Sequence, residues 1–272
     1  MPIIELFSYE FMQRAYVAGI AVAIVCPLIG VFLVLRRLSL LADGLGHVTF
    51  AGLAAGFLFG IYPLFAALIA AIIGAVGIER IRTRGKIAGD AAIAMFYTAG
   101  LAVGVVLVSR AGGFNVNVLG YLFGSIAAVA LPDLFTVLGL AALVVILSGI
   151  FYKELLFLTF DEASARAAGL PAGAVNILLS ALAAVTTVAA MRIVGLLLVS
   201  SLMVLPALTA IRLASSFRQT LGLAVAAALI AVLIGLTASF YLDTAPGGTI
   251  VLTALALFGL ASLWEGRRAQ AG

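Results

Sequence analysis

Nine apolar stretches, each close to the length that crosses a membrane, follow one another along this chain. A helix that spans a bilayer needs about 20 mainly apolar residues, and short polar, glycine or proline breaks separate stretches of about that length. The stretches are residues 15–35, 43–60, 63–78, 91–109, 134–152, 172–191, 193–211, 221–242 and 248–264. We therefore predict an all-α integral membrane protein, a polytopic bundle of about nine spans or of eight. The apolar stretch 118–131 is too short to span comfortably and predicts a re-entrant or interfacial helix.

The composition agrees with a chain made almost entirely of spanning helices. Of its 272 residues, 65% are hydrophobic and only 10% are charged, whereas a soluble domain carries roughly 25% charged residues. No stretch is polar enough to form a separate soluble domain, so we predict one membrane domain over residues 1–272. The net charge of +4 implies no nucleic-acid partner, because in this class of protein basic residues set the orientation in the bilayer.

The basic residues predict which way the chain faces. With the N-terminus outside and nine spans, 12 of the 15 Lys and Arg residues lie on the cytoplasmic side. The three that fall outside are Arg14, Arg110 and Arg192. Cytoplasmic loops carry an excess of Lys and Arg, so we expect the N-terminus outside and the C-terminus in the cytoplasm.

One acid and one imidazole lie in the second apolar stretch and form the first candidate site. His47 is the only histidine of the chain and follows Asp43 by four residues, which puts both side chains on one face of a helix. Ionisable groups inside a membrane are expensive and mostly functional, and this pair suits zinc, manganese or ferrous iron. Two ligands are too few for a closed site, and Cys26 is the only cysteine. Two copies of the chain would supply two Asp and two His, a set suited to tetrahedral zinc.

The residues alone leave a structural role open for this pair. His47 could simply hydrogen-bond Asp43, or Asp43 could cap the helix. The row of Asp43 and His47 continues through Ala51 and Ala55. Glycines recur at every fourth position of the same stretch and predict close packing with another helix: Gly52, Gly56 and Gly60.

The second candidate is a short charged segment between two spans. Residues 160–171 predict a short helix with Asp161 near its N-cap, Gly169 at its end and Pro171 at the start of the next span. On the cytoplasmic side, such a helix docks a soluble partner or merely connects two spans. The turn 241–250, expected outside, is either a contact for an external partner or a simple loop.

Two absences narrow the function. The chain has no G-x-x-x-x-G-K-[ST] motif, so we do not expect it to hydrolyse ATP and do not classify it as an enzyme. Asp43 is the only acid clearly inside a predicted span, which is too few for a proton relay.

An ordered series of motifs resembles the membrane subunits of the ABC importers for zinc and manganese. The series runs nearly end to end and includes Tyr9-Glu-Phe-Met-Gln-Arg-Ala15, Gly30-Val-Phe-Leu-Val-Leu-Arg-Arg37, Leu41-Ala-Asp-Gly-Leu-Gly-His47, Asn117-Val-Leu-Gly-Tyr-Leu-Phe-Gly-Ser125, Asp161-Glu-Ala with Gly169-Leu-Pro171, Leu205-Pro206-Ala207, and Phe240-Tyr-Leu-Asp-Thr with Gly248-Thr-Ile-Val-Leu252. One departure is Gly44-Leu45-Gly46, where relatives often carry bulkier residues or a serine. The extra glycine predicts a looser start to this helix.

The resemblance implies an architecture and a set of partners. It implies a homodimer with the fold of the vitamin B12-importer-like permeases, in the inner membrane of a bacterial cell. Each copy would dock a cytoplasmic ATP-binding subunit, and an extracytoplasmic metal-binding protein would deliver the ion. Asp43 and His47 match positions associated with the metal path. Asp161, Glu162 and Gly169, within a coupling segment of about residues 153–171, match the helix seated on the ATPase.

The cargo implied is a divalent metal, with no permanently bound cofactor and with ATP used by the partner subunit. Leu41-Ala-Asp43 and the turn 243–249 look closer to the zinc-uptake branch. The ligand set agrees, because manganese prefers more oxygen ligands than two Asp and two His provide. We therefore expect zinc, with manganese or iron as alternatives. The rival functions are a stand-alone channel or secondary transporter, and an importer of a metal chelate.

Overall fold

The computed structural model describes residues 8–83, 89–113, 116–126 and 129–271, and these ranges fold as helices without strands. Arg84 and Lys86, assigned to the cytoplasmic side above, lie outside the described residues. The helices are α2 (Glu10–Leu35), α3 (Leu40–Phe59), α4 (Pro63–Thr83), α5 (Gly89–Arg110), α6 (Val116–Phe123), α7 (Leu131–Ile150), α8 (Tyr152–Phe160), α9 (Glu162–Ala167), α10 (Ala172–Ala190), α11 (Val199–Leu213), α12 (Phe217–Leu242) and α13 (Pro246–Ala271). The predicted all-α membrane fold is confirmed.

Each of the nine predicted spans coincides with a helix, but the helix of the seventh, 193–211, is short. Among the described residues, eight helices are long and apolar enough to cross a membrane, and α11 is an apolar helix of 15 residues. The predicted span 193–211 was wrong at its start, because residues 191–198 form turns before α11 begins. The predicted short helix 118–131 is also shorter, since α6 ends at Phe123 and α7 starts at Leu131. Asp133 accepts a hydrogen bond from the backbone N–H of Ala130 at 3.3 Å and caps α7 there.

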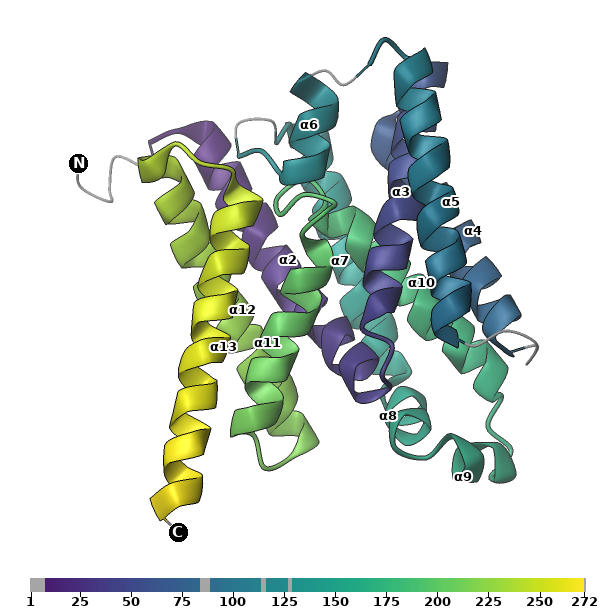
Figure 1. The fold of residues 1–272 in the computed structure, drawn as a ribbon, viewed down its shortest axis with the longest axis vertical. Coiled ribbons are helices and arrows are strands. Elements are labelled where there is room, and N and C mark those ends of the chain that lie inside the picture. Colours follow the sequence, from purple (N-terminus) through teal and green to yellow (C-terminus); the bar gives the residue numbers. More distant parts are fainter. Residues whose placement is uncertain (1–7, 84–88, 114–115, 127–128, 272) are drawn as a thin grey trace.

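The helices form one bundle with two distinct ends (Figure 1). α6 lies at one end, here called the α6 end, and α8 and α9 lie at the opposite end, called the α9 end. α2 starts at the α6 end and α13 finishes at the α9 end, so the two ends of the described chain lie at opposite ends of the bundle. α3 packs along α4 and α5, while α2 packs along α11 and α12. α10 contacts both groups and so joins them.

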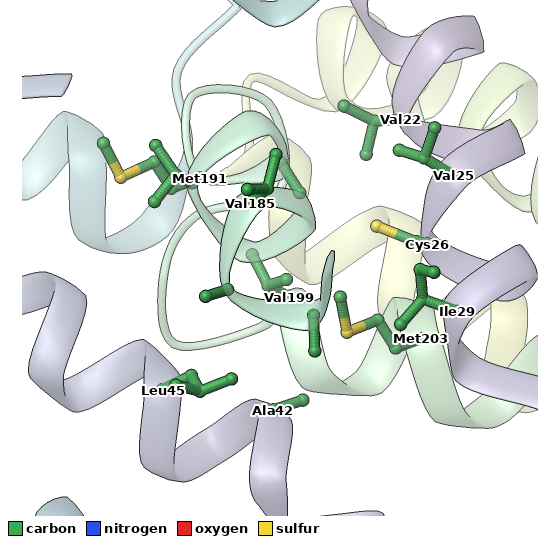
Figure 2. Close-up of a cluster of buried hydrophobic side chains, with 14 of the residues drawn as sticks. Val22, Val25, Cys26, Ile29, Ala42, Leu45, Val185, Met191, Val199 and Met203 are labelled. Atoms are coloured by element: carbon green, nitrogen blue, oxygen red, sulfur yellow. The ribbon is translucent and has the colours of Figure 1, made fainter. Parts of the chain in front are cut away.

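The core lies where α2, α3, α10 and α11 meet. Figure 2 shows side chains from these helices, with Cys26 of α2, Leu45 of α3, Val185 of α10 and Met203 of α11 pointing into the same region. Cys26 is free and fully buried, which fits a small apolar core residue.

The glycines of α3 serve close packing, as expected for two of the three. A Cβ on Gly52 would lie 2.5 Å from the Cβ of Ala70 in α4, and one on Gly56 would lie 2.9 Å from the backbone of Pro63. Gly60 instead ends the helix in a left-handed conformation with φ of 68°. The helix α3 is continuous from Leu40, and a looser start stays a prediction. Gly44 makes close contact with α5, where a Cβ would lie 2.8 Å from Ile93.

The irregular segment 191–198 is mostly buried, apart from the exposed Leu197, and is held by α6. Leu196 donates its backbone N–H to the carbonyl of Tyr121 at 2.9 Å, and Leu197 donates to that of Leu122 at 3.2 Å. These bonds satisfy backbone groups that a broken helix leaves unpaired inside an apolar bundle. Gly195 adopts a φ of 86°, and a Cβ there would lie 2.4 Å from the backbone of residue 123. The segment therefore requires glycine at this point.

Candidate metal site

Asp43 and His47 lie one turn apart on a row of α3 that the rest of the described chain leaves partly open. The row continues through Ala51 and Ala55, and all four residues are half-buried. Several residues on the other sides of the helix, such as Leu45 and Leu53, are fully buried against neighbouring helices. The row, called the Asp43 row below, therefore faces a space that this chain does not fill by itself.

His47 has an imidazole nitrogen without a partner. Its Nδ1 atom is buried and makes no hydrogen bond within the described part of the chain. The imidazole lies against the ring of Tyr97 in α5, with ring centroids 3.9 Å apart. Buried polar atoms are nearly always hydrogen-bonded or ligated. Within the described chain, Nδ1 therefore stays an unsatisfied polar atom.

The two structural alternatives for the pair are not seen. No hydrogen bond joins His47 to Asp43 among the described residues. The N-cap residue of α3 is Ser39, and Asp43 follows it by four residues. Asp43 therefore neither caps α3 nor holds the imidazole in this structure.

Asp43 opens into a groove between α3, α11 and α13 with a volume of about 430 Å³. The polar lining consists of Asp43 and the hydroxyl residues Ser39, Ser200 and Ser201. The apolar lining comes from Leu40, Val204, Leu205, Val251 and Leu255. The two serines of α11 were not predicted as site residues. The sequence gives little indication of this role. The two serines line the groove because α11 begins at Val199, later than the predicted span.

Within its described residues, one chain does not provide a complete metal site. They contain no group of three or more His, Cys, Asp or Glu side chains that could hold a metal ion. The metal role of Asp43 and His47 stays a prediction.

Two further acids are buried, each near the end of a candidate span. Both lie just outside the predicted spans 63–78 and 134–152, so Asp43 as the only acid clearly inside a predicted span stays a prediction. Glu79 of α4 and Asp133 of α7 are each 2% exposed. Each is neutralised by an arginine, Glu79 by Arg82 at 2.9 Å and Asp133 by Arg192 at 2.6 Å. A buried charge requires a partner of this kind. Asp43 differs from both, because it forms no ion pair within the described residues.

The Asp133–Arg192 pair belongs to a polar cluster near the α6 end. The hydroxyl of Tyr62, in the α3–α4 turn, donates to Asp133 at 2.7 Å. Burial and this hydrogen bond raise the pKa of Tyr62 to about 12. The guanidinium of Arg192 lies 4.0 Å from the ring centroid of Tyr121 in α6. Arg192 is one of the three basic residues predicted outside. Its contacts join the segment 191–198 to α6 and α7, and through Asp133 to the α3–α4 turn.

The predicted short helix of the coupling segment is confirmed as α9. The carboxylate of Asp161 accepts a hydrogen bond from the backbone N–H of Ser164 at 2.9 Å and caps the helix. The Ser164 contacts hold the pKa of Asp161 below its usual value. Gly169 follows the helix with a φ of 86°. The carboxylate of Glu162 is bound within the chain by Arg36 at 3.0 Å, a partner 126 residues away that sequence reasoning missed.

The comparison with known proteins decides the family. A family model described as the ABC 3 transport family matches residues 8–265, nearly the whole chain. The chain belongs to the ABC 3 transport family. Membership confirms the resemblance to metal-ion ABC permeases that the motif series indicated, and it accounts for the fold.

Relatives within this family are named for manganese. The chain is 34% identical to the manganese transport system membrane protein MntC of Halalkalibacterium halodurans, over 98% of this chain and 95% of that protein. It is 31% identical to the manganese import system permease protein ScaB of Streptococcus gordonii, over 93% and 91% of the two chains. The solved structure of PsaBC from Streptococcus pneumoniae in complex with Fab aligns with a TM-score of 0.86 and 32% identity, over 95% of this chain and 93% of that chain. These matches do not specifically support the expected zinc branch of the family.

Proposed function

We propose that this chain is the transmembrane permease subunit of an ATP-driven importer of a divalent metal ion. It acts as one membrane domain over residues 1–272 and works by alternating access as a homodimer. The observation that carries the proposal is the Asp43 row, with an unpaired carboxylate and a buried, unpartnered imidazole nitrogen on a half-buried helix face. Membership of the ABC 3 transport family supports the same function.

The second copy of the chain completes the site in this proposal. Each chain supplies one carboxylate and one imidazole, and a two-fold axis beside the Asp43 row would bring together two of each. A transport site must also release its ion, so we expect weaker binding there than in a protein that captures the metal. Asp43 and His47 fit this role because only two side chains per copy hold the ion.

Manganese is the cargo that the relatives favour over the zinc expected from the sequence motifs. MntC and ScaB are both named for manganese. The groove beside Asp43 also contributes three serine hydroxyls, and manganese prefers oxygen ligands more strongly than zinc does. We therefore propose manganese as the first cargo to test, with zinc and iron as the alternatives.

The proposed importer needs three partners besides the bilayer. They are a second copy of the chain, an ATP-binding subunit and an extracytoplasmic metal-binding protein. Most described basic residues lie in helix ends or loops at the α9 end, which the positive-inside rule assigns to the cytoplasm. The ATP-binding subunit would then dock around α9, and the metal-binding protein at the α6 end. In a bacterial inner membrane, we therefore propose the N-terminus outside and the C-terminus in the cytoplasm.

The test is metal-stimulated ATP hydrolysis and metal uptake by the complete complex in liposomes. We expect manganese to stimulate both, and Asp43→Ala and His47→Ala to lower uptake by about 100-fold or more. The matched control is Asp90→Ala, which removes an exposed acid from the first turn of the neighbouring helix α5 and should leave uptake unchanged. Normal uptake by both Asp43→Ala and His47→Ala would end the ligand assignment. Uptake by the permease without its ATPase would favour a channel or secondary transporter.

A further inference from the structure

A half-buried ion pair connects α9 to the corner between α2 and α3. The Nη2 atom of Arg36 donates to Oε2 of Glu162 at 3.0 Å. The Arg36 side chain is only 6% exposed, whereas Arg166, the other partner of Glu162, is 56% exposed. Separating a buried charge from its partner is costly, while an exposed pair contributes little. Arg166 makes the shorter contact, at 2.6 Å, but the buried guanidinium of Arg36 would lose more than the exposed one of Arg166 on separation from Glu162.

The corner that carries Arg36 is rigid and leads directly into the candidate metal helix. After α2, the backbone N–H of Arg37 bonds to the carbonyl of Val34, and that of Leu38 bonds to the carbonyl of Leu33. This is the Schellman arrangement, with Arg37 in the left-handed conformation at a φ of 58°. The N–H of Leu41, in the first turn of α3, bonds back to the carbonyl of Leu38 at 2.9 Å. A displacement of the corner is thus passed to the turn of α3 that precedes the metal ligands.

Neighbouring charges at the α9 end act on Arg36 in opposite directions. Arg82, in the last turns of α4, disfavours the charge of Arg36, Glu79 favours it, and the two bind each other at 2.9 Å. The other contacts of α9 are different, since its backbone packs against α8 and α10. Two routes therefore lead from α9 towards α3, one through the ion pair and one through the packing of α10.

We propose that Arg36 is a positioning residue for transport, which links the movement of α9 to the metal-binding turn of α3 through its ion pair with Glu162. The inference rests on the proposed function, in which an ATP-binding subunit moves α9. When α9 shifts, Glu162 carries the guanidinium of Arg36 with it, and the rigid corner shifts the start of α3. Asp43 then changes its position relative to the second copy, and the affinity of the site for the ion falls or rises. Glu162 thus acts within the permease, in addition to its predicted place in the coupling segment.

The test compares coupling, and not only activity, in the complete complex reconstituted with its ATP-binding subunit. The variants are Arg36→Gln, Glu162→Gln, the double variant and the conservative Arg36→Lys. For each variant, metal transported per ATP hydrolysed is measured beside co-elution of the ATP-binding subunit. We expect Arg36→Gln and Glu162→Gln to keep the complex assembled and to lower metal transported per ATP by about fivefold or more. The double variant should lose no more than the worse single variant, and Arg36→Lys should retain most of the coupling.

One further variant separates this ion pair from general effects of charge. Arg212→Gln breaks an exposed pair with Glu265, and it should transport as the unchanged protein does. Glu162→Gln is nearly isosteric and partly exposed, so it should fold even where Arg36→Gln does not.

The outcomes distinguish this inference from the proposed function. Unchanged coupling in Glu162→Gln, together with loss of uptake in Asp43→Ala, would overturn the role of Arg36 and leave the route through α10. Normal uptake in Asp43→Ala would instead remove the proposed function. Loss of the ATP-binding subunit from Glu162→Gln would also overturn the inference, because Glu162 would then act in docking.

Discussion

The imidazole of His47 lies against the phenol ring of Tyr97, with ring centroids 3.9 Å apart and ring planes inclined by 56°. Tyr97 stands on α5, which runs beside α3. The aromatic contact fixes the orientation of the imidazole. Orientation of a ligand by its neighbours is a large part of metal affinity.

Replacement of Tyr97 should therefore impair metal handling without removing a ligand. We expect Tyr97→Ala to lower metal uptake by about tenfold, because the imidazole loses the surface that orients it. Tyr97→Phe keeps the ring and should retain most of the uptake. The measurement is initial uptake rate against metal concentration in liposomes that carry the complete complex. Equal uptake by both variants and the unchanged protein would show that the ring does not orient His47.

Gly100 allows α5 to approach the backbone of His47. A Cβ at this position would lie 2.7 Å from the carbonyl carbon and oxygen of His47, so Gly100→Ala must push α5 away from α3. We expect the free energy of unfolding to fall by about 1–3 kcal/mol, with a parallel loss of uptake. The matched control is Gly139→Ala in α7, where nothing lies within 4 Å of the added carbon. Thermal unfolding in detergent compares the two, and equal stability would contradict the close contact.

The Asp133–Arg192 pair should be costly to break on one side only. Both side chains are largely buried, so Asp133→Ala leaves an unpaired guanidinium and should destabilise the protein by about 3–5 kcal/mol. The double variant Asp133→Leu with Arg192→Met leaves no buried charge and should cost less than Asp133→Ala alone. Glu10→Ala, which breaks an exposed pair with Arg14, should cost less than about 1 kcal/mol. A double variant less stable than Asp133→Ala would refute this account.

The contribution of Glu162 to stability should depend on pH in a defined direction. Burial by itself raises the pKa of Glu162, but the hydrogen bond from Arg166 and the charge of Arg36 outweigh it and hold the pKa below its usual value. Because the folded-state pKa is the lower one, the ionised carboxylate stabilises the fold above the unfolded-state pKa. That stability is lost as the pH falls through the folded-state pKa. The difference in Tm between the protein and Glu162→Gln should be constant at about pH 6–8 and shrink towards about pH 4. A difference in Tm that grows as the pH falls would contradict this prediction.

Much of the fold was predictable because membrane spans are local in the sequence. Length and hydropathy of a stretch decide whether it can cross a bilayer, and each predicted span coincides with a helix. The predicted boundaries were wrong where a tertiary contact, and not the local hydropathy, decides the backbone conformation. Residues 191–198 read as part of an apolar span, but the backbone groups of α6 hold them as a turn. No local sequence pattern predicts that the backbone of α6 bonds to this segment.

The candidate site was predictable only in part. Asp43 and His47 stand out because ionisable residues are rare in apolar stretches, and α9 was predicted from its capping residues. Ser200 and Ser201 could not be assigned, because their place in the groove depends on how α11 crosses α3. Glu79 and Asp133 were missed as buried acids because both lie just outside the predicted spans 63–78 and 134–152, and their burial depends on tertiary packing.

The sequence by itself determined the membrane class, the order of the helices, the two candidate ligands and the short helix between two spans. These follow from composition and from spacing along a single helix, which depend on neighbours a few residues away. Only the tertiary structure decided that the Asp43 row is left uncovered and that the Nδ1 atom of His47 has no partner. It also decided that Glu162 pairs with Arg36 across 126 residues. Such facts depend on how helices pack against one another, and that packing joins residues that no local pattern relates.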